Sequence, residues 1–346
     1  RLLNEQLDRS PKAEAKPAEL FAFLDACLLD AASRTGSKGK PLTQTSLRVY
    51  RRACTVLREY QQAKFKRRPF GFETIDADPT AFYNDYRYFL TREKGFSTNT
   101  VGKNLKTLKT FLLEAQAQGL LKNFNPRRFK AIAEEAESIY LNESELDALA
   151  ALDLSQNLRL DRVRDLFLVG CWTGLRFSDF TRLRSDSLTP DGRFFDLTQQ
   201  KTGDRVKIPV SPTVRAVLGK YEGRTANSLP PAISNVKMNA YLKELGQLAG
   251  LDSPVTVRKT KGGMLTTRTV EKWELLTTHV ARRSFATNMV QRDYPVAMIM
   301  GVTGHKTEAM FWKYVKLPQP DRAEQLLRLM ENHTPADRRG VFKIAV

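Results

Sequence analysis

The segment TSLRVYRRACTVLREYQQAKF, at residues 45–65, repeats its apolar side chains with the period of an α-helix. These side chains recur at spacings of three and four residues, at Leu47, Tyr50, Cys54, Leu57 and Tyr60. Arginines lie between them, so one face is apolar and the other is basic. The pattern predicts a long helix that packs its apolar face into a core and turns its arginines toward solvent.

Two further segments predict helices that complete a helical domain at residues 43–130. One spans 79–95, from a Pro-Thr start to a glycine stop, and the other spans 97–119, from a Ser or Thr cap to a glycine. In the latter, Lys103, Lys106 and Lys109 recur every third residue, and Glu114 is its only acidic residue. A stripe of this kind also fits an ordinary solvated face, but its lysines lack glutamate partners one turn away. We therefore expect it to bind DNA together with three arginines of the first helix, Arg48, Arg51 and Arg52.

The charge of the chain indicates a polyanionic partner. The formal net charge is +18, and residues 41–130 hold 18 Lys and Arg against 7 Asp and Glu. Nucleic acid is the commonest such partner, with an anionic membrane surface as the alternative. No run is long and apolar enough for a membrane span, and the start is no signal peptide. The three cysteines show no CxxC spacing, which argues against a disulfide framework or a zinc site and fits a reducing cytoplasm.

A second domain is expected at residues 142–320, after a linker at 131–141 where the composition changes from basic to acidic. Asn142 and Glu145 have capping-box spacing at its start. The domain is expected to be mostly helical with one β-hairpin, RFFDLTQQKTGDRVKIPV, in which two β-rich runs flank a Lys-Thr-Gly-Asp turn. A linker with one helix (1–42) and a C-terminal helix and tail (321–346) complete the chain. The predicted fold class is mainly α, with two domains and a small hairpin.

Three motifs of the second domain place cations where an anion would bind. In GCWTGLRFSDF, Arg176 falls in the first turn of a new helix, where backbone N–H groups already favour an anion. Asp179 lies three residues later, placed to hold Arg176. Lys201 stands at the hairpin tip, and His279 and Arg282 project from one face at the start of another helix. Taken singly, each residue also fits an ordinary surface position.

The segment GHKTEAMFWKY, at residues 304–314, adds a histidine and a tyrosine. On an unbroken helix, nine residues would place His305 and Tyr314 on opposite faces. Gly304 stops the preceding helix, however, and Thr307 is suited to cap the next. His305 is therefore expected in a turn and Tyr314 on the following helix, free to converge. Alone, Tyr314 fits an ordinary half-buried tyrosine equally well.

The order of these motifs resembles that of the tyrosine recombinase (phage integrase) family. TGLRFSD is similar to its first-arginine box, HVARRSFAT to its His-x-x-Arg box, and GHKTEAMFWKY to its final box. LNESEL resembles the opening of the catalytic domain, and the match covers roughly 43–330. The final segment looks most like integrases of mobile elements and conjugative transposons from Bacteroidetes-type bacteria. The resemblance implies a two-domain clamp on DNA, with a SAM-like core-binding domain and a mostly α catalytic domain.

The resemblance also implies a role for each residue of the set. Tyr314 would attack the scissile phosphate and form a 3′-phosphotyrosyl link. Arg176 and Arg282 would neutralise the non-bridging oxygens, and Lys201 would protonate the leaving 5′-oxygen. His279 and His305 would hydrogen-bond the phosphate or assist proton transfer. No ATP, metal or other cofactor is needed, because the transesterification retains the bond energy. Arg283 departs from the family, many members of which carry histidine there, and its role stays open.

The expected function is site-specific recombination, for integration or excision of a mobile element. The alternatives are a type IB topoisomerase-like activity and a non-catalytic DNA-binding protein of the same fold. The expected partners are a double-stranded recombination site, other copies in a tetramer with a dimer on each site, and host or element-encoded DNA-bending factors. The expected location is the cytoplasm, on the nucleoid. An arm-binding domain is expected upstream of Arg1, and the tail, with Leu326, Leu327, Leu329 and Met330, docks either on a neighbouring copy or on its own domain.

Overall fold

The computed structural model describes residues 19–33, 41–66, 68, 70–225, 227–317 and 323–331, the last without 325 and 329. The chain forms two compact units. The first contains residues up to Ala136 together with Arg258–Thr267, and the second contains Glu137–Val257 and the residues from Arg268 onward. Within the described residues, no helix has the length and apolar character needed to cross a membrane.

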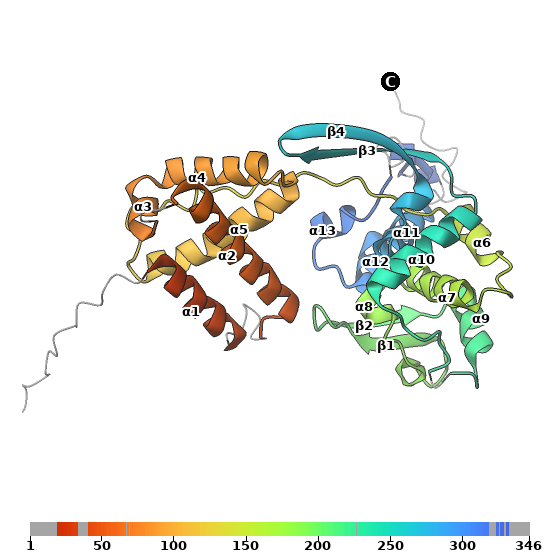
Figure 1. The fold of residues 1–346 in the computed structure, drawn as a ribbon. Coiled ribbons are helices and arrows are strands. Elements are labelled where there is room, and N and C mark those ends of the chain that lie inside the picture. Colours follow the sequence, from red (N-terminus) through yellow and green to blue (C-terminus); the bar gives the residue numbers. More distant parts are fainter. Residues whose placement is uncertain are drawn as a thin grey trace, which may run out of the picture. The chain divides into compact units, whose positions relative to one another are not determined.

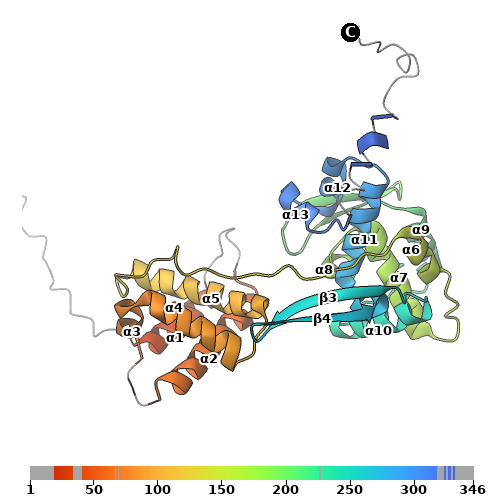
Figure 2. The ribbon, with the colours of Figure 1, turned by 90° about the horizontal axis from the view of Figure 1, so that it is seen from above.

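The first unit is a cluster of helices (Figures 1 and 2). Its core is rich in aromatic side chains. Its helices are α1 (Leu20–Ser33), α2 (Gln44–Lys64), α3 (Phe72–Ala77), α4 (Pro79–Tyr88), the π-helical η1 (Phe89–Glu93) and α5 (Thr98–Ala117). Helix α2 packs against both α1 and α5. Buried Tyr60 of α2 lies among the rings of Phe70, Phe82 and Tyr86. The core also takes in side chains of α1, which precedes the expected domain start at residue 43.

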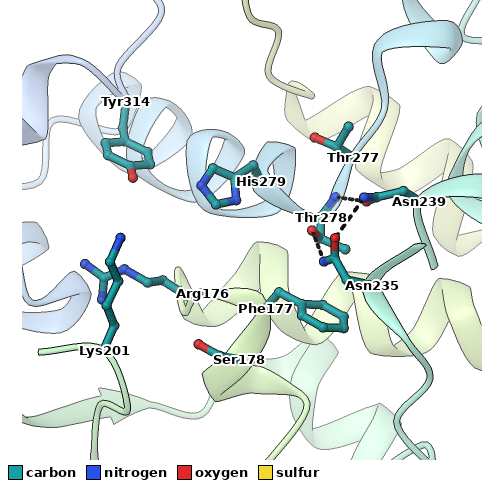
Figure 3. Close-up of a pocket in the computed structure, with 10 residues that line it drawn as sticks. All are labelled: Arg176, Phe177, Ser178, Lys201, Asn235, Asn239, Thr277, Thr278, His279 and Tyr314. Carbon is teal, nitrogen blue, oxygen red and sulfur yellow. Dashed lines mark hydrogen bonds between the residues drawn. The ribbon is translucent and has the colours of Figure 1, made fainter. Parts of the chain in front are cut away.

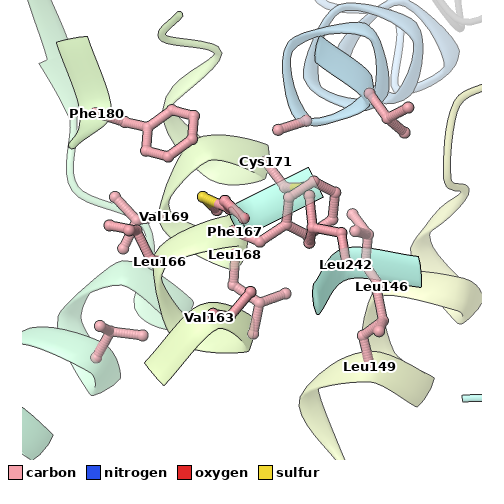
Figure 4. Close-up of a cluster of buried hydrophobic side chains, with 14 of the residues drawn as sticks. Leu146, Leu149, Val163, Leu166, Phe167, Leu168, Val169, Cys171, Phe180 and Leu242 are labelled. Carbon is pink, nitrogen blue, oxygen red and sulfur yellow. The ribbon is translucent and has the colours of Figure 1, made fainter. Parts of the chain in front are cut away.

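The second unit is built around α7 (Leu158–Thr173). Helix α7 packs against α6 (Glu143–Ala150), α8 (Phe177–Phe180), α9 (Pro212–Tyr221), α10 (Asn235–Leu248) and α11 (Thr278–Gln291). Because α7 has neighbours on several sides, Leu166, Phe167, Leu168 and Val169 are all buried (Figure 4). The unit also contains α12 (Val296–Thr303), α13 (Glu308–Trp312) and the short 3-10 helices η2 (Ser185–Ser187) and η3 (Lys272–Leu275). This packing holds the ends of α7 and α11 against each other, where the candidate site forms.

The predicted hairpin is confirmed at β1 (Phe194–Thr198) and β2 (Arg205–Pro209), which pair antiparallel from Phe194 opposite Pro209 to Thr198 opposite Arg205. A second pair, β3 (Pro254–Lys261) and β4 (Met264–Glu271), corrects the expectation of a single hairpin. Its turn uses Gly262 and Gly263 at φ of 59° and 74°, a conformation that favours glycine. The described residues do not include 1–18, 34–40, 321–322, 325, 329 and 332–346 of the expected terminal segments.

Candidate active site

Arg176 enters the site because the chain reverses direction after α7. Gly174 ends that helix at φ 64°, and a Cβ there would lie 2.4 Å from the ring of Phe285. Only glycine fits both the left-handed backbone and the close approach of α11. The turn places Arg176 at the N-cap position of α8, where its side chain is half-buried and its Nη1 donates to Oε1 of Gln199 at 2.7 Å.

Gln199, at the end of β1, is the residue that holds Arg176. Its side chain is fully buried, and its Oε1 also accepts from the Thr202 hydroxyl at 3.2 Å. Its Nε2 donates to the carbonyl of Thr303 at 3.0 Å, directly before the Gly304–His305 turn. Gln199 therefore joins the arginine, the lysine hairpin and the histidine turn. The sequence analysis did not identify it, although a glutamine two residues before Lys201 was visible in the hairpin motif.

The expectation that Asp179 holds Arg176 is wrong. Oδ1 of Asp179 accepts from the backbone N–H of Gln200 at 2.9 Å, and no hydrogen bond or ion pair joins its carboxylate to Arg176 in the described part of the chain. The carboxylate is buried and its charge supports that of Arg282. Asp179 thus fixes the backbone beside Gln199 and lowers the electrostatic cost of the nearby cations.

Arg282 is the most deeply placed cation of the site, with 1% of its surface exposed on α11. Its Nη1 donates to the carbonyl of Gly174 at 2.8 Å, and its Nη2 donates to Nε2 of His305 at 3.0 Å. Burial, followed by repulsion from Arg176, lowers the pKa of Arg282 to about 10. Nε is buried without a hydrogen-bond partner among the described residues, so one donor of this guanidinium is unused.

His305 is neutral and supports Arg282. A guanidinium only donates, so Nε2 of His305 must accept and the ring proton must lie on Nδ1. Nδ1 then donates to the Thr303 hydroxyl at 2.8 Å, which donates in turn to the Ile299 carbonyl at 2.8 Å. Burial and the charges of Arg282 and Arg176 lower the pKa of His305 to about 3. His305 does not line the cavity that contains Tyr314, and it contacts a second cavity beside β2 and α12.

Tyr314 approaches the site from the other side of the same turn. Gly304 ends α12 at φ 71°, and the Thr307 hydroxyl caps α13 by accepting from the N–H of Met310, as the sequence predicts. Tyr314 itself lies in the turn after α13 rather than on the helix, and its N–H donates to the Phe311 carbonyl at 2.8 Å. Its ring centroid is 4.9 Å from that of His305 and 5.3 Å from the Arg282 guanidinium. His305 and Tyr314 therefore do converge.

One cavity of about 430 Å³ collects four of the six predicted site residues (Figure 3). They are Arg176, Lys201, His279 and Tyr314, while Arg282 stands behind the Tyr314 ring. Lys201 and His279 are exposed to the cavity. Partial burial of its ring lowers the pKa of His279, followed by the charge of Arg283 and then those of Arg282, Lys201 and Arg176. The result is a concave surface lined by two cations, a neutral imidazole and a phenol, with the third cation, Arg282, behind it. Such a surface suits a phosphate group.

The chain matches two known domain families. Residues 140–319 match the phage integrase family, and residues 22–131 match the phage integrase SAM-like domain. The chain belongs to the phage integrase family. The tyrosine recombinases XerA of Pyrococcus furiosus and Pyrococcus horikoshii are 24% and 26% identical to it over 258 and 231 residues. Those alignments cover 70% and 65% of this chain and 78% and 72% of the two relatives.

Solved structures of other integrases share the fold of this family member. A lambda integrase dimer bound to a COC′ core site matches with a TM-score of 0.62 at 17% identity, over 86% of this chain and 95% of that chain. The Tn1549 transposon integrase in complex with transposon right end DNA matches with a TM-score of 0.61 at 15% identity, over 90% and 99% of the two chains. At these identities the matches establish the fold.

The six residues that we expected to bind DNA all lie on the first unit of this integrase family member. Arg48 and Arg51 are exposed on α2, and Lys103 and Lys106 are exposed on α5. Arg52 is exposed but pairs with Glu59 at 3.3 Å. Lys109 is half-buried, and its ammonium donates to the carbonyl of Pro126, so it is a correction to the predicted stripe. Among the described residues, no group of three or more His, Cys, Asp or Glu side chains is placed to hold a metal ion.

Proposed function

We propose that this chain is a site-specific DNA recombinase that cleaves and rejoins strands through a 3′-phosphotyrosyl intermediate. One observation carries the proposal: the Tyr314 phenol shares a cavity with Arg176, Lys201 and His279. A nucleophile, a candidate proton donor and anion-binding groups thus face one space. Membership of the chain in the phage integrase family supports the same reaction.

The chemistry is a balanced exchange of phosphodiester bonds. Oη of Tyr314 attacks the phosphorus of the scissile phosphate and loses its proton as the new bond forms. The bond between phosphorus and the 5′-oxygen breaks, and Lys201 supplies the proton that this oxygen needs. A 5′-hydroxyl from a second strand then attacks the phosphotyrosine and restores the phenol. The number of phosphodiester bonds is unchanged, so no external energy source enters the reaction.

The arginines and His279 stabilise the charge that develops on the phosphate. Arg176 is held in place by Gln199, and Arg282 is held by Gly174 and His305. Arg282 is buried behind the Tyr314 ring, with its guanidinium 5.3 Å from the ring centroid, and contributes its positive charge from there. His279 has a lowered pKa, so it is neutral near pH 7 and suited to accept the phenol proton or to hydrogen-bond the phosphate. In this arrangement His305 positions Arg282 rather than contacting DNA itself.

Double-stranded DNA and other copies of the chain are the proposed partners. The lambda integrase structures that share this fold include a dimer bound to a core site and a tetramer bound to a Holliday junction. By analogy, the exposed basic residues of α2 and α5 contact DNA phosphates, and paired sites assemble a tetramer. The Tn1549 integrase supports a natural task in integrating or excising a mobile element. The proposal also includes host or element-encoded DNA-bending factors and action on the nucleoid. The C-terminal tail docks either on a neighbouring copy or on its own domain.

The test uses a pool of nicked duplexes of random sequence and a denaturing gel that retains covalent protein–DNA adducts. The wild-type chain is expected to form adducts, and sequencing their DNA identifies the recombination site. Tyr314→Phe is the matched variant, expected to bind the recovered duplex with unchanged affinity and to form no adduct. An adduct with Tyr314→Phe would exclude Tyr314 as the nucleophile. Adducts without strand exchange between two recovered sites would favour a topoisomerase instead.

A further inference from the structure

The first turn of α11 carries His279 but has no cap of its own. Thr277 occupies the N-cap position, and its side chain makes no capping hydrogen bond. A helix start leaves backbone N–H groups without partners inside the helix, and a capping side chain usually satisfies one of them. Several other helices of the same unit follow this rule, with the capping residues Asn142, Asn157, Ser211 and Ser234. Helices α8 and α12 also begin without a side-chain cap, but α11 is the uncapped helix that bears two of the proposed site residues.

Two asparagines of α10 supply the missing partner from outside. Oδ1 of Asn239 accepts from the backbone N–H of Thr278 at 2.9 Å (Figure 3). Nδ2 of Asn239 donates to Oδ1 of Asn235 at 3.0 Å, and Nδ2 of Asn235 donates to the Thr278 hydroxyl at 2.9 Å. The three residues form a closed ring of hydrogen bonds. Because the Thr278 N–H can only donate, the ring also fixes which end of each amide faces which neighbour.

This ring of hydrogen bonds lies in the wall of the cavity, next to His279. Asn235, Asn239 and Thr278 line the same cavity as His279. In Figure 3 the asparagines lie on one side of His279, and Lys201, Arg176 and Tyr314 lie on the other. His279 follows Thr278 directly, so any rotation of the first turn of α11 moves its imidazole within the cavity. Thr278 is buried, which leaves the turn little room to adjust by itself.

The choice of an amide at position 239 is also informative. Asparagine and aspartate cap helix starts about equally well, so capping alone does not favour an amide. An aspartate here would put a negative charge beside a cavity that is lined by Arg176 and Lys201 and suited to a phosphate. Such a charge would repel the phosphate and offset the cations. A neutral amide supplies the acceptor for Thr278 without that cost.

We infer that Asn239, itself oriented by Asn235, is a positioning residue that sets the direction of His279 toward the phosphate. The inference rests on the proposed function, because the phosphate in question is the scissile phosphate of DNA. Asn239 touches the backbone of α11 and acts through His279 rather than on the reacting atoms. The neutral ring predicts an effect on the rate of cleavage rather than on DNA affinity.

The test measures single-turnover adduct formation on the nicked duplex recovered with the wild-type chain. Asn239→Ala removes the acceptor for Thr278 and is expected to slow cleavage about tenfold or more, with little change in DNA affinity. Asn239→Asp restores the acceptor and is expected to cleave several-fold faster than Asn239→Ala once DNA is bound. It should bind DNA more weakly and reach its maximal rate at a higher pH. Its carboxylate would favour protonated His279, whereas the cations Arg176, Lys201, Arg282 and Arg283 oppose that protonation. The other titratable group that lines the cavity is the phenol of Tyr314.

Asn157→Ala is the matched control for stability. It removes an asparagine cap from the far end of α7, a 16-residue helix that is about 24 Å long. It should lower the melting temperature about as much as Asn239→Ala while leaving the cleavage rate unchanged. Equal cleavage rates for wild type and Asn239→Ala, or equal slowing by Asn239→Ala and Asn157→Ala, would refute the positioning role alone. A wild-type chain that forms no adduct would instead refute the proposed function, and this role with it.

Discussion

His305 shows how a single residue can matter to the site without facing the proposed substrate. Both of its ring nitrogens are engaged, Nε2 by Arg282 and Nδ1 by Thr303, and its ring packs beside Tyr314. A proton added to Nε2 would remove the acceptor and set a second cation against the guanidinium of Arg282. The fixed tautomer therefore depends on the histidine being neutral, which its buried position and the nearby arginines enforce.

This dependence predicts a component of stability that is lost in acid. The pKa of His305 is about 3 in the folded chain and about 6.5 when unperturbed, so the unfolded chain binds the proton more tightly. Its contribution to the free energy of unfolding is complete above about pH 6.5 and is lost progressively as the pH falls toward about 3. His305→Gln should therefore show a shallower loss of stability between about pH 7 and about pH 4, measured by urea unfolding. His279→Gln, which alters an exposed imidazole, should change that slope less, and parallel curves for wild type and His305→Gln would contradict the prediction.

Residue types and spacing located the proposed set in the sequence, but not the partners of each residue. Five members of the set lie near helix starts and turns, which glycines, threonines and capping patterns indicate in the sequence. They are Arg176, His279, Arg282, His305 and Tyr314. Spacing along one helix suggested Asp179 as the partner of Arg176. The observed partner is Gln199, which follows strand β1 and lies 23 residues later in the sequence. Lys109 likewise donates to a carbonyl 17 residues later. Contacts between elements depend on packing, which local periodicity does not encode.

At the scale of elements, the predictions succeeded where one face of the element is buried. Strand β2 alternates buried and exposed residues, and its hairpin was recognisable. Strands β3 and β4 are mostly exposed, so their sequences do not alternate apolar and polar residues in the way that predicts a strand. Only the Gly262–Gly263 pair indicates their turn. Tyr314 was placed on a helix but lies in the turn just beyond α13, because helix ends shift by a residue or two with small changes in local hydrogen bonding.

Helix α12 offers a matched pair of glycines that separates a turn requirement from helix propensity. Gly304 ends the helix at φ 71°, and a Cβ there would lie 2.8 Å from the amide of Gln199, whereas a Cβ on Gly301 would meet nothing within 4 Å. Gly304→Ala should destabilise the chain by about 1–2 kcal/mol from backbone strain and slow adduct formation by displacing Gln199 and His305. Gly301→Ala should stabilise it by about 0.5–1 kcal/mol, since alanine favours the helix. Urea unfolding of both variants tests the pair, and equal effects would show that Gly304 is not needed for the turn.

At the scale of the whole molecule, charge and chemistry are divided between the two units. The basic surplus that the sequence reveals falls on the first unit, and the residues of the proposed phosphate site all lie in the second. This division can be proposed from the sequence, because composition and motifs are properties of segments. It does not predict which cations are free to meet DNA, because that depends on neighbours such as Glu59 and Pro126. The salt dependence of DNA binding distinguishes the two kinds of cation.

Replacing both Lys103 and Lys106 with alanine should reduce that salt dependence. Both side chains are exposed on α5, and each phosphate contact that is lost lowers the slope of log affinity against log salt by about 0.9, so the double variant should lose about 2. Lys109→Ala is the matched control from the same helix. Its ammonium holds the Pro126 carbonyl, so its loss should lower the melting temperature of the first unit and leave the slope unchanged. The slopes of the double variant and of Lys109→Ala are compared by measuring DNA affinity with fluorescence anisotropy over a series of salt concentrations. An unchanged slope in the double variant would remove α5 from the DNA-binding face.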